Sequence, residues 1–281
     1  MTTITLHKHH GLGNDFLILL DPDASQPIDA ALARALCDRH RGIGADGLIR
    51  ATGSGDGILT FELRNADGGA AEMSGNGMRC LAHAALDAGM VPADTPFLVA
   101  TPAGPRTVTV RPGPGAAQAW ATVEMGRAVV AGNGERCNVG HGQLRVDMGN
   151  PHLVVLGPDP ATVAVGELGP ALETSVAGGQ NVEFVALGPG PDEVTMRVWE
   201  RGVGETLACG TGAAAAAAAM AHWGRVGTRV TVHQRGGDAD VELRADGTVV
   251  LGGPSVRIAR CRVEVDPVGD PASPPRPGVS A

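Results

Sequence analysis

Two short segments of the chain place a nucleophilic side chain just before a predicted helix. Residues 74–77 read SGNG and residues 209–212 read CGTG. Glycines at a helix start let backbone N–H groups approach a ligand, and the positive helix end favours an anion such as a carboxylate. The same field favours a thiolate over a thiol, so the sequence predicts a lowered pKa for Cys209 and a role for it as a base.

These segments belong to an internal repeat. Residues 61–65 (FELRN) precede SGNG by eight residues, and residues 196–200 (MRVWE) precede CGTG by the same interval. The offset between SGNG and CGTG is 135 residues, and a second matched pair, Gly13-Asn14 and Gly149-Asn150, lies 136 residues apart. A repeat of this kind predicts two structurally equivalent halves, with Ser74 and Cys209 facing each other across a cleft.

The helices and strands that must position these residues can be predicted from runs of apolar residues and from the prolines and glycines that interrupt them. We expect α/β character in both halves, with a linker at residues 111–115 (RPGPG) because two prolines and two glycines sustain neither helix nor strand. A hairpin is expected to turn at residues 245–247. The expected strands are 16–20, 58–63, 97–100, 107–110, 119–124, 153–156, 184–187 and 195–199, and the expected helices are 28–37, 77–87 and 211–222.

Composition narrows the class of protein. The 281 residues are 43% hydrophobic with a net charge of −8, and neither an apolar run of membrane-spanning length nor a basic cluster for nucleic acid appears. The start of the chain does not read as a secretory signal, so the cytoplasm is the expected location. Five widely spaced cysteines without a C-x-x-C pair indicate reduced thiols and no metal site. Lys8 is the only lysine, which argues against a pyridoxal-phosphate enzyme.

Each candidate residue also has a purely structural interpretation. Cys209 could be a small buried side chain, and Ser74 could be a helix N-cap. His152 and Glu200 could orient or polarise a thiol, or could simply be exposed. Asparagines beside glycine or at strand ends commonly form turns, which applies to Asn14, Asn65, Asn76, Asn150 and Asn181.

Taken together, the motifs resemble those of the diaminopimelate epimerases. The resemblance covers residues 6 to about 260 and rests on GLGNDF (11–16), GIGADG (42–47), NADG (65–68), SGNGMRC (74–80), GNPH (149–152), NVEF (181–184) and ERGVGETLACGTG (200–212). It implies an α/β protein of the α+β type with two pseudo-symmetric domains, each a curved, mostly antiparallel sheet wrapped around a central helix. The active site would lie in the cleft between them.

The implied domain boundaries are 1–112, completed by a returning strand near 256–265, and 116–255. Residues 266–281, dominated by Pro, Gly and Ser, are expected to form a disordered tail. A homodimer would be compatible with the resemblance. The implied partner is a small-molecule amino acid, with no nucleic acid and no membrane.

The implied reaction is inversion of one α-carbon of L,L-diaminopimelate to the meso form, without any cofactor. One thiolate removes the α-proton from one face, and a thiol on the other face returns a proton. Cys209 would be one member of the pair, supported by His152 and Glu200. The implied substrate-binding residues are Asn14, Asn65, Gly75, Asn76, Asn150, Asn181, Glu200, Arg201, Gly210 and Thr211.

Ser74 departs from the family pattern, since it stands where the other catalytic cysteine is expected. A hydroxyl is far less acidic than a thiol, whose ordinary pKa is about 8.5, so impaired two-base activity is expected. Three explanations follow: an engineered Cys-to-Ser exchange, a natural enzyme in which Ser74 relays a proton slowly, or a relative with altered chemistry. The alternative functions are a single-base epimerase or dehydratase of another amino acid that uses Cys209, and a catalytically silent binding protein.

Overall fold

The computed structural model describes residues 2–53, 57–135 and 142–265. The N-terminal half contains β1 (Thr2–Gly11), β2 (Asn14–Leu20), α1 (Ala30–Cys37), β3 (Gly47–Ala51), β4 (Leu59–Thr60), β5 (Glu62–Asn65), β6 (Ala70–Ala71), α2 (Gly75–Asp87), β7 (Phe97–Thr101) and β8 (Gly104–Pro112). The C-terminal half contains β10 (Val129–Glu135), β11 (Gly142–Asp147), β12 (Pro151–Leu156), the 3-10 helix η1 (Pro160–Thr162), α3 (Val165–Glu173), β13 (Asn181–Leu187), β14 (Glu193–Glu200), β15 (Gly204–Thr206), α4 (Gly210–His222), β16 (Arg229–Gln234) and β17 (Gly237–Leu243). Two further strands, β9 (Gln118–Arg127) and β18 (Thr248–Val265), connect the halves.

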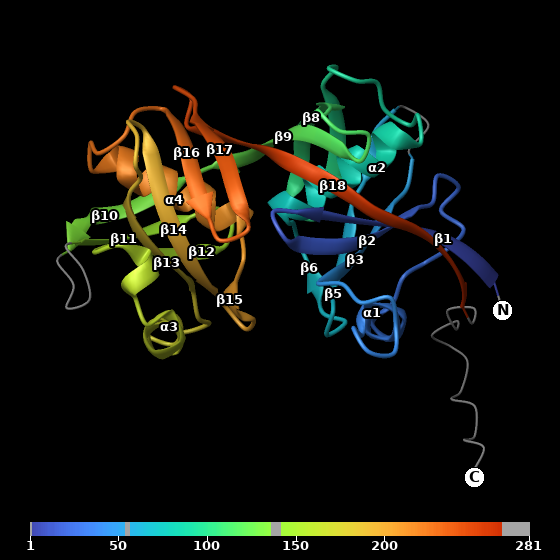
Figure 1. Cartoon of the computed structure of the whole chain (residues 1–281), viewed down its shortest axis with the longest axis horizontal. Coiled ribbons are helices and arrows are strands. Elements are labelled where there is room, and N and C mark those ends of the chain that lie inside the picture. The colour runs from blue at the N-terminus through green and yellow to red at the C-terminus, as the bar shows by residue number, and fades with distance from the viewer. Residues whose placement is uncertain (1, 54–56, 136–141, 266–281) are drawn as a thin grey trace, which may run out of the picture.

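The two halves repeat the same strand pairing. In the N-terminal half β2 pairs parallel with β3, β3 pairs antiparallel with β5, and β4 pairs parallel with β7. In the C-terminal half β12 pairs parallel with β13, β13 pairs antiparallel with β14, and β14 pairs parallel with β16. Figure 1 shows a mostly antiparallel sheet curving around one helix in each half. The expected α+β fold of two pseudo-symmetric units is therefore confirmed.

The helices α2 and α4 form the two centres of packing. Every residue of α2 from Gly75 to Ala85 is buried, and α4 is buried from Ala213 to Met220. A helix that is buried on all sides must be surrounded by other elements, and here β1, β2, β8, β9 and β18 pack around α2. The alanine run of α4 lets β11, β14 and β17 approach its backbone closely.

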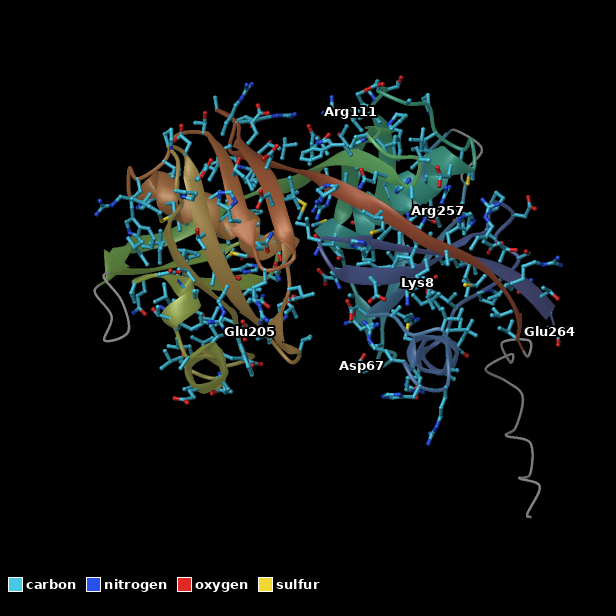
Figure 2. All side chains as sticks on the ribbon, viewed as in Figure 1. Lys8, Asp67, Arg111, Glu205, Arg257 and Glu264 are labelled. Carbon is cyan, nitrogen blue, oxygen red and sulfur yellow. The ribbon has the colours of Figure 1, made fainter. Side chains whose placement is uncertain are left out.

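The structure corrects the expected linker at residues 111–115. This segment leads into the turn of a hairpin, because β8 pairs antiparallel with β9 from Val108 opposite Val123 to Pro112 opposite Ala119. The chain crosses between the halves further on, where β9 also pairs with β18. β18 in turn pairs with β17 at its start and with β1 at its end, so the returning strand expected at 256–265 is the far part of a longer strand. Figure 2 shows Arg257 and Glu264 on that part of β18, over the N-terminal half.

One predicted strand is divided in the structure. The expected strand over 58–63 is interrupted at Phe61, whose N–H donates to the carbonyl of Ala100. β4 pairs with β7, whereas β5 pairs with β3, so the chain changes neighbours at this residue. The hairpin expected at 245–247 is present, since β17 and β18 pair antiparallel. The described residues do not include the tail predicted over 266–281, nor Cys137. None of the described helices is long and apolar enough to cross a bilayer.

Candidate active site

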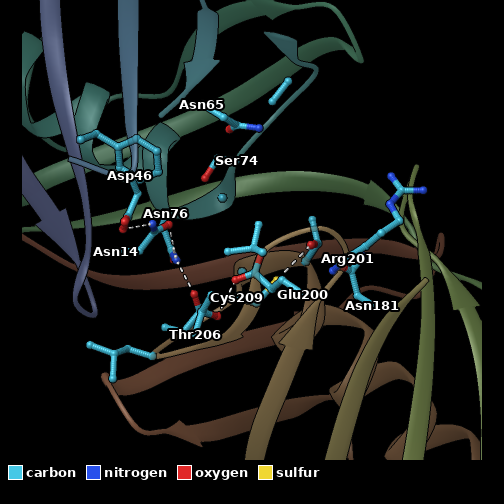
Figure 3. A pocket seen from close by; sticks show the side chains of 18 of the residues that line it. Asn14, Asp46, Asn65, Ser74, Asn76, Asn181, Glu200, Arg201, Thr206 and Cys209 are labelled. Carbon is cyan, nitrogen blue, oxygen red and sulfur yellow. Dashed lines mark hydrogen bonds between the residues drawn. The ribbon is translucent and has the colours of Figure 1, made fainter. Parts of the chain in front are cut away.

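A pocket of about 770 Å³ lies where the two halves meet. Figure 3 shows side chains entering it from both halves, with Ser74 and Asn65 opposite Cys209 and Glu200. Of the predicted site residues, His152 alone is absent from its lining. The lining includes Asn14, Asn65, Ser74, Gly75, Asn76, Asn150, Asn181, Glu200, Arg201, Cys209, Gly210 and Thr211.

The two nucleophiles occupy equivalent positions at the starts of α2 and α4. Ser74 is the N-cap of α2, and its Oγ accepts from the Gly77 N–H at 3.0 Å. Cys209 is the N-cap of α4, and its Sγ accepts from the Gly212 N–H at 3.3 Å. Both residues have extended backbone angles, so each side chain folds back over its helix start.

Close approach of the two helix starts explains the glycines that follow the caps. A Cβ added to Gly210 would lie 3.2 Å from the Cα of Gly75, and a Cβ on either glycine would lie within 2.9 Å of a Leu251 methyl. A larger residue at either position would separate the helix ends. The unpaired N–H groups of both helices are thereby directed at one small volume, which suits a carboxylate.

The surroundings of Cys209 overturn the predicted direction of its pKa. Burial of the thiol and the nearby carboxylates of Glu200 and Glu183 raise the pKa of Cys209 well above its ordinary value. Hydrogen bonds from Thr211 and from the Gly212 N–H act in the opposite direction and do not offset these effects. The helix start was identified from the sequence, but the acidic neighbours come from other strands.

Of these two carboxylates, Glu200 lines the pocket, at the end of β14. Its Oε1 accepts from Thr206 Oγ1 at 2.5 Å. Desolvation raises the pKa of Glu200, and the charge of Glu183 adds to this, while the bond from Thr206 lowers it. Two carboxylates close to the Cys209 thiol leave this part of the pocket suited to a cationic group, such as an ammonium.

His152 lies behind the pocket wall instead of in it. The side chain is fully buried, with Nδ1 2.7 Å from Glu183 Oε1 and Nε2 3.1 Å from Asn150 Oδ1. It therefore contacts the pocket through Asn150. Glu183 was not identified as a site residue from the sequence, although it lies within the NVEF motif. Its carboxylate approaches the start of α4, where a Cβ on Gly212 would lie 2.8 Å from Glu183 Oε1.

The predicted asparagines hold the pocket wall together. Asn76 Nδ2 donates to Asn14 Oδ1 and to the Ala208 carbonyl, both at 3.2 Å, so this side chain joins the halves. Asn14 Nδ2 donates to Asp46 Oδ2 at 2.6 Å. Asn181 Oδ1 accepts from the Arg201 N–H at 3.0 Å.

Several charged residues of the lining were missed from the sequence. Arg39 and Asp46 come from the N-terminal half, and Glu205 and Arg235 come from the C-terminal half. Arg39 donates to Asp46 Oδ1 at 2.8 Å, and Arg235 donates to Glu205 Oε1 at 3.1 Å. Asp46 lies within the GIGADG motif and Glu205 within ERGVGETLACGTG, so these two motifs gave the available signal. Within the described residues, no three His, Cys, Asp or Glu side chains gather as metal ligands would.

Comparison with known proteins gives a consistent relationship. A family model described as diaminopimelate epimerase matches residues 6–131 and 144–258. The chain is 42% identical over 278 residues to the diaminopimelate epimerase of Mycobacterium tuberculosis, covering 90% of this chain and 94% of the relative. It is 39% identical over 274 residues to that of Synechococcus elongatus, covering 89% and 95%.

Solved structures share the architecture at low sequence identity. A predicted epimerase from Pseudomonas aeruginosa superposes with a TM-score of 0.73 at 17% identity, covering 94% of this chain and all of that one. A probable proline racemase from Agrobacterium radiobacter superposes with a TM-score of 0.72 at 18% identity, covering 95% and 94%. These likenesses concern the fold. With the family model and the two relatives spanning almost the whole chain, the protein belongs to the diaminopimelate epimerase family.

Proposed function

We propose that the chain interconverts L,L- and meso-diaminopimelate by removing the α-proton on one face and delivering a proton on the other, without a cofactor. The observation that carries this proposal is the pair of equivalent N-caps, Ser74 and Cys209, which enter one pocket from opposite halves. Inversion requires acid/base groups on both faces of one carbon, and this placement of the two side chains supports that role.

The helix starts support binding of the reacting amino acid. In the proposal its α-carboxylate lies between the first N–H groups of α2 and α4, where two positive helix ends converge. Its α-ammonium lies beside Glu200, the pocket-lining carboxylate that raises the pKa of Cys209. An ammonium there would offset the negative charge that raises the pKa of Cys209, so substrate binding itself would favour the thiolate.

The remaining polar residues suit the second amino-acid centre of diaminopimelate. Asn65, Asn150, Asn181 and Arg201 also line the pocket and offer several hydrogen-bond donors. His152, through Asn150, is assigned a supporting role behind this wall. Arg201 can make two parallel bonds to a carboxylate, which suits the distal end of the substrate.

Ser74 makes the two faces unequal. A serine hydroxyl can donate or relay a proton, but it forms an alkoxide far less readily than a cysteine forms a thiolate. The proposal therefore assigns proton removal to Cys209 and slow proton delivery to Ser74. Epimerisation in this protein is expected to be slower than exchange of the α-proton with solvent at the Cys209 face.

The test is incubation with L,L-diaminopimelate in deuterated water. Deuterium at the α-carbon is followed by mass spectrometry, and the meso isomer is followed by chiral chromatography. Deuterium entry that exceeds meso formation supports the proposal. Absence of both deuterium entry and meso product, in this protein and in Ser74→Cys, would refute the substrate assignment.

A further inference from the structure

A fully buried arginine lies directly behind the pocket without a countercharge. Arg79, on α2, has 0% of its surface exposed. Among the described residues no carboxylate forms an ion pair with it, and its Nε and Nη1 have no hydrogen-bond partner. Burial lowers the pKa of Arg79 to about 10, so the side chain remains charged at neutral pH. An unpaired buried cation destabilises the folded protein, so its presence must be explained by a function and not by the fold.

The guanidinium of Arg79 occupies a space that is open because two neighbouring residues are glycines. A Cβ on Gly253 of β18 would lie 1.6 Å from Arg79 Nη1, and a Cβ on Gly11 would lie 3.4 Å from Nη2. Side chains on a helix lean toward its N-terminus, so the charge of Arg79 lies beside the start of α2. Both the helix end and the guanidinium are positive there, and they reinforce each other.

The arginine also fixes the orientation of a pocket residue. Arg79 Nη2 donates to Asn76 Oδ1. Because a guanidinium can only donate, Asn76 must turn its oxygen toward Arg79 and its amide group away. That amide group donates to Asn14 Oδ1 and to the carbonyl of Ala208, the residue before Cys209. Arg79 thus orients a side chain that connects the start of α2 to the segment carrying the thiol.

We propose that Arg79 is a positioning residue for the substrate carboxylate: it orients Asn76 across the two halves, and its missing countercharge is supplied by the carboxylate bound at the helix starts. This inference rests on the proposed function. It explains why a buried cation is kept unpaired, since a carboxylate in the protein would neutralise the site before the ligand arrives. Arg79 is not in the pocket lining, so it acts through Asn76 and through its charge.

The experiment compares four variants of the full-length chain. Arg79→Met removes the charge and keeps much of the volume, and Arg79→Lys keeps the charge. Gly253→Ala keeps Arg79 but displaces its guanidinium. Arg106→Met is the matched control, because Arg106 is a partly buried arginine of β8 with an unpartnered Nε and lies outside the pocket lining. Affinity for meso-diaminopimelate is measured by titration calorimetry, KM and kcat by α-deuterium incorporation, and the melting temperature by calorimetry.

Arg79→Met should weaken binding by about 10- to 100-fold, mainly through KM, as expected for a charge-assisted interaction. Its melting temperature should change by no more than about 4 °C, because loss of the bond to Asn76 is offset by removal of an unpaired charge. Arg79→Lys should recover part of the affinity, Gly253→Ala should lose affinity, and Arg106→Met should bind normally.

Two results would overturn the inference. One is normal binding by Arg79→Met. The other is a loss of binding that Arg79→Lys does not recover and that accompanies a large fall in melting temperature, which would make Arg79 purely structural. If the unmodified protein failed to bind diaminopimelate at all, the proposed function would fail, and this inference with it.

Discussion

Ser74 and Cys209 accept equivalent hydrogen bonds, one in each half of the molecule. Each caps a 13-residue helix and accepts from the N–H three residues later, at 3.0 Å to the hydroxyl and 3.3 Å to the thiol. The positions are therefore geometrically alike but chemically unequal. A hydroxyl at one of them limits the rate at which a proton can leave or arrive on that face.

Replacing Ser74 with cysteine should raise epimerisation by about 100-fold or more, the usual contribution of a positioned acid/base group. The cap would be retained, because a cysteine already fills the equivalent position at the start of α4. The rate of meso formation from L,L-diaminopimelate would be compared between the two proteins at equal folded concentration. An unchanged rate would show that Ser74 does not limit the reaction.

Replacing Cys209 with serine should abolish α-proton exchange and leave the fold intact. The serine hydroxyl can accept from the Gly212 N–H as Ser74 accepts from Gly77, so capping is kept. Cys209→Ala should also be inactive, and should cost about 1 kcal/mol of unfolding free energy through loss of the cap. Deuterium incorporation and urea denaturation would test both. Residual exchange in Cys209→Ser near the unmodified rate would argue against this thiol as the base.

Replacing Glu200 with glutamine should lower the pKa of Cys209. Glu200 is a negative neighbour that raises this pKa, so removing its charge leaves more thiolate at a given pH. Alkylation of Cys209 by iodoacetamide should become about tenfold faster at neutral pH if the pKa falls by about one unit. Peptide mass spectrometry would separate alkylation of Cys209 from that of Cys261, which is partly exposed.

The matched control for this measurement is Glu205→Gln. Glu205 also lines the pocket, but its carboxylate is paired with Arg197 and Arg235 and is not among the groups that shift the Cys209 pKa. Alkylation of Cys209 should therefore be unchanged in this variant. Equal acceleration in both variants would point to easier access of the reagent and not to a change in pKa.

The buried histidine His9 should make the protein less stable in acid. Burial, with a contribution from His83, lowers the pKa of His9 to about 2, against 6.5 for an ordinary histidine. The unfolded chain therefore takes up a proton below pH 6.5 that the folded chain does not. The contribution of His9 to the free energy of unfolding is therefore full above pH 6.5 and decreases as the pH falls below 6.5.

Between pH 7.5 and 5.5 this residue alone should remove about 1.4 kcal/mol of unfolding free energy. Urea denaturation at the two pH values would measure the loss. In His9→Gln the difference between the two pH values should be smaller by that amount. An identical pH dependence in both proteins would show that His9 is protonated equally in the folded and unfolded states.

The sequence predicted the parts of the site that local chemistry determines. Glycine beside Ser74 and Cys209, repeated at one offset, was enough to locate both helix starts and the pocket between them. What it could not predict depends on strands distant in the chain. The raised pKa of Cys209 comes from burial of the thiol and from the carboxylates of Glu200 and Glu183. Glu200 was a candidate residue, but no pattern near residue 209 indicates that these effects outweigh that of the helix start.

The same limit applies to predicting the fold from the sequence. The strands over 16–20 and 195–199 were visible because they are apolar runs, and α4 because it is an alanine run with a glycine beyond its end. The hairpin at 111–115 was read as a linker, because prolines and glycines signal a change of direction without indicating which strand comes next. The interruption at Phe61 depends on a bond to Ala100, which no local pattern reveals.

The two strands that connect the halves, β9 and β18, affect how the chain can fold while it is being synthesised. The sheet of the N-terminal half is completed by residues 256–265 of β18, which pair with β1. A ribosome makes β1 before the second half and this segment after most of it, so the first half cannot close its sheet while the second is still emerging. Until then the outer edge of β1 stays open to pairing with other strands. Both halves must therefore finish folding together, after residues 256–265 have been made.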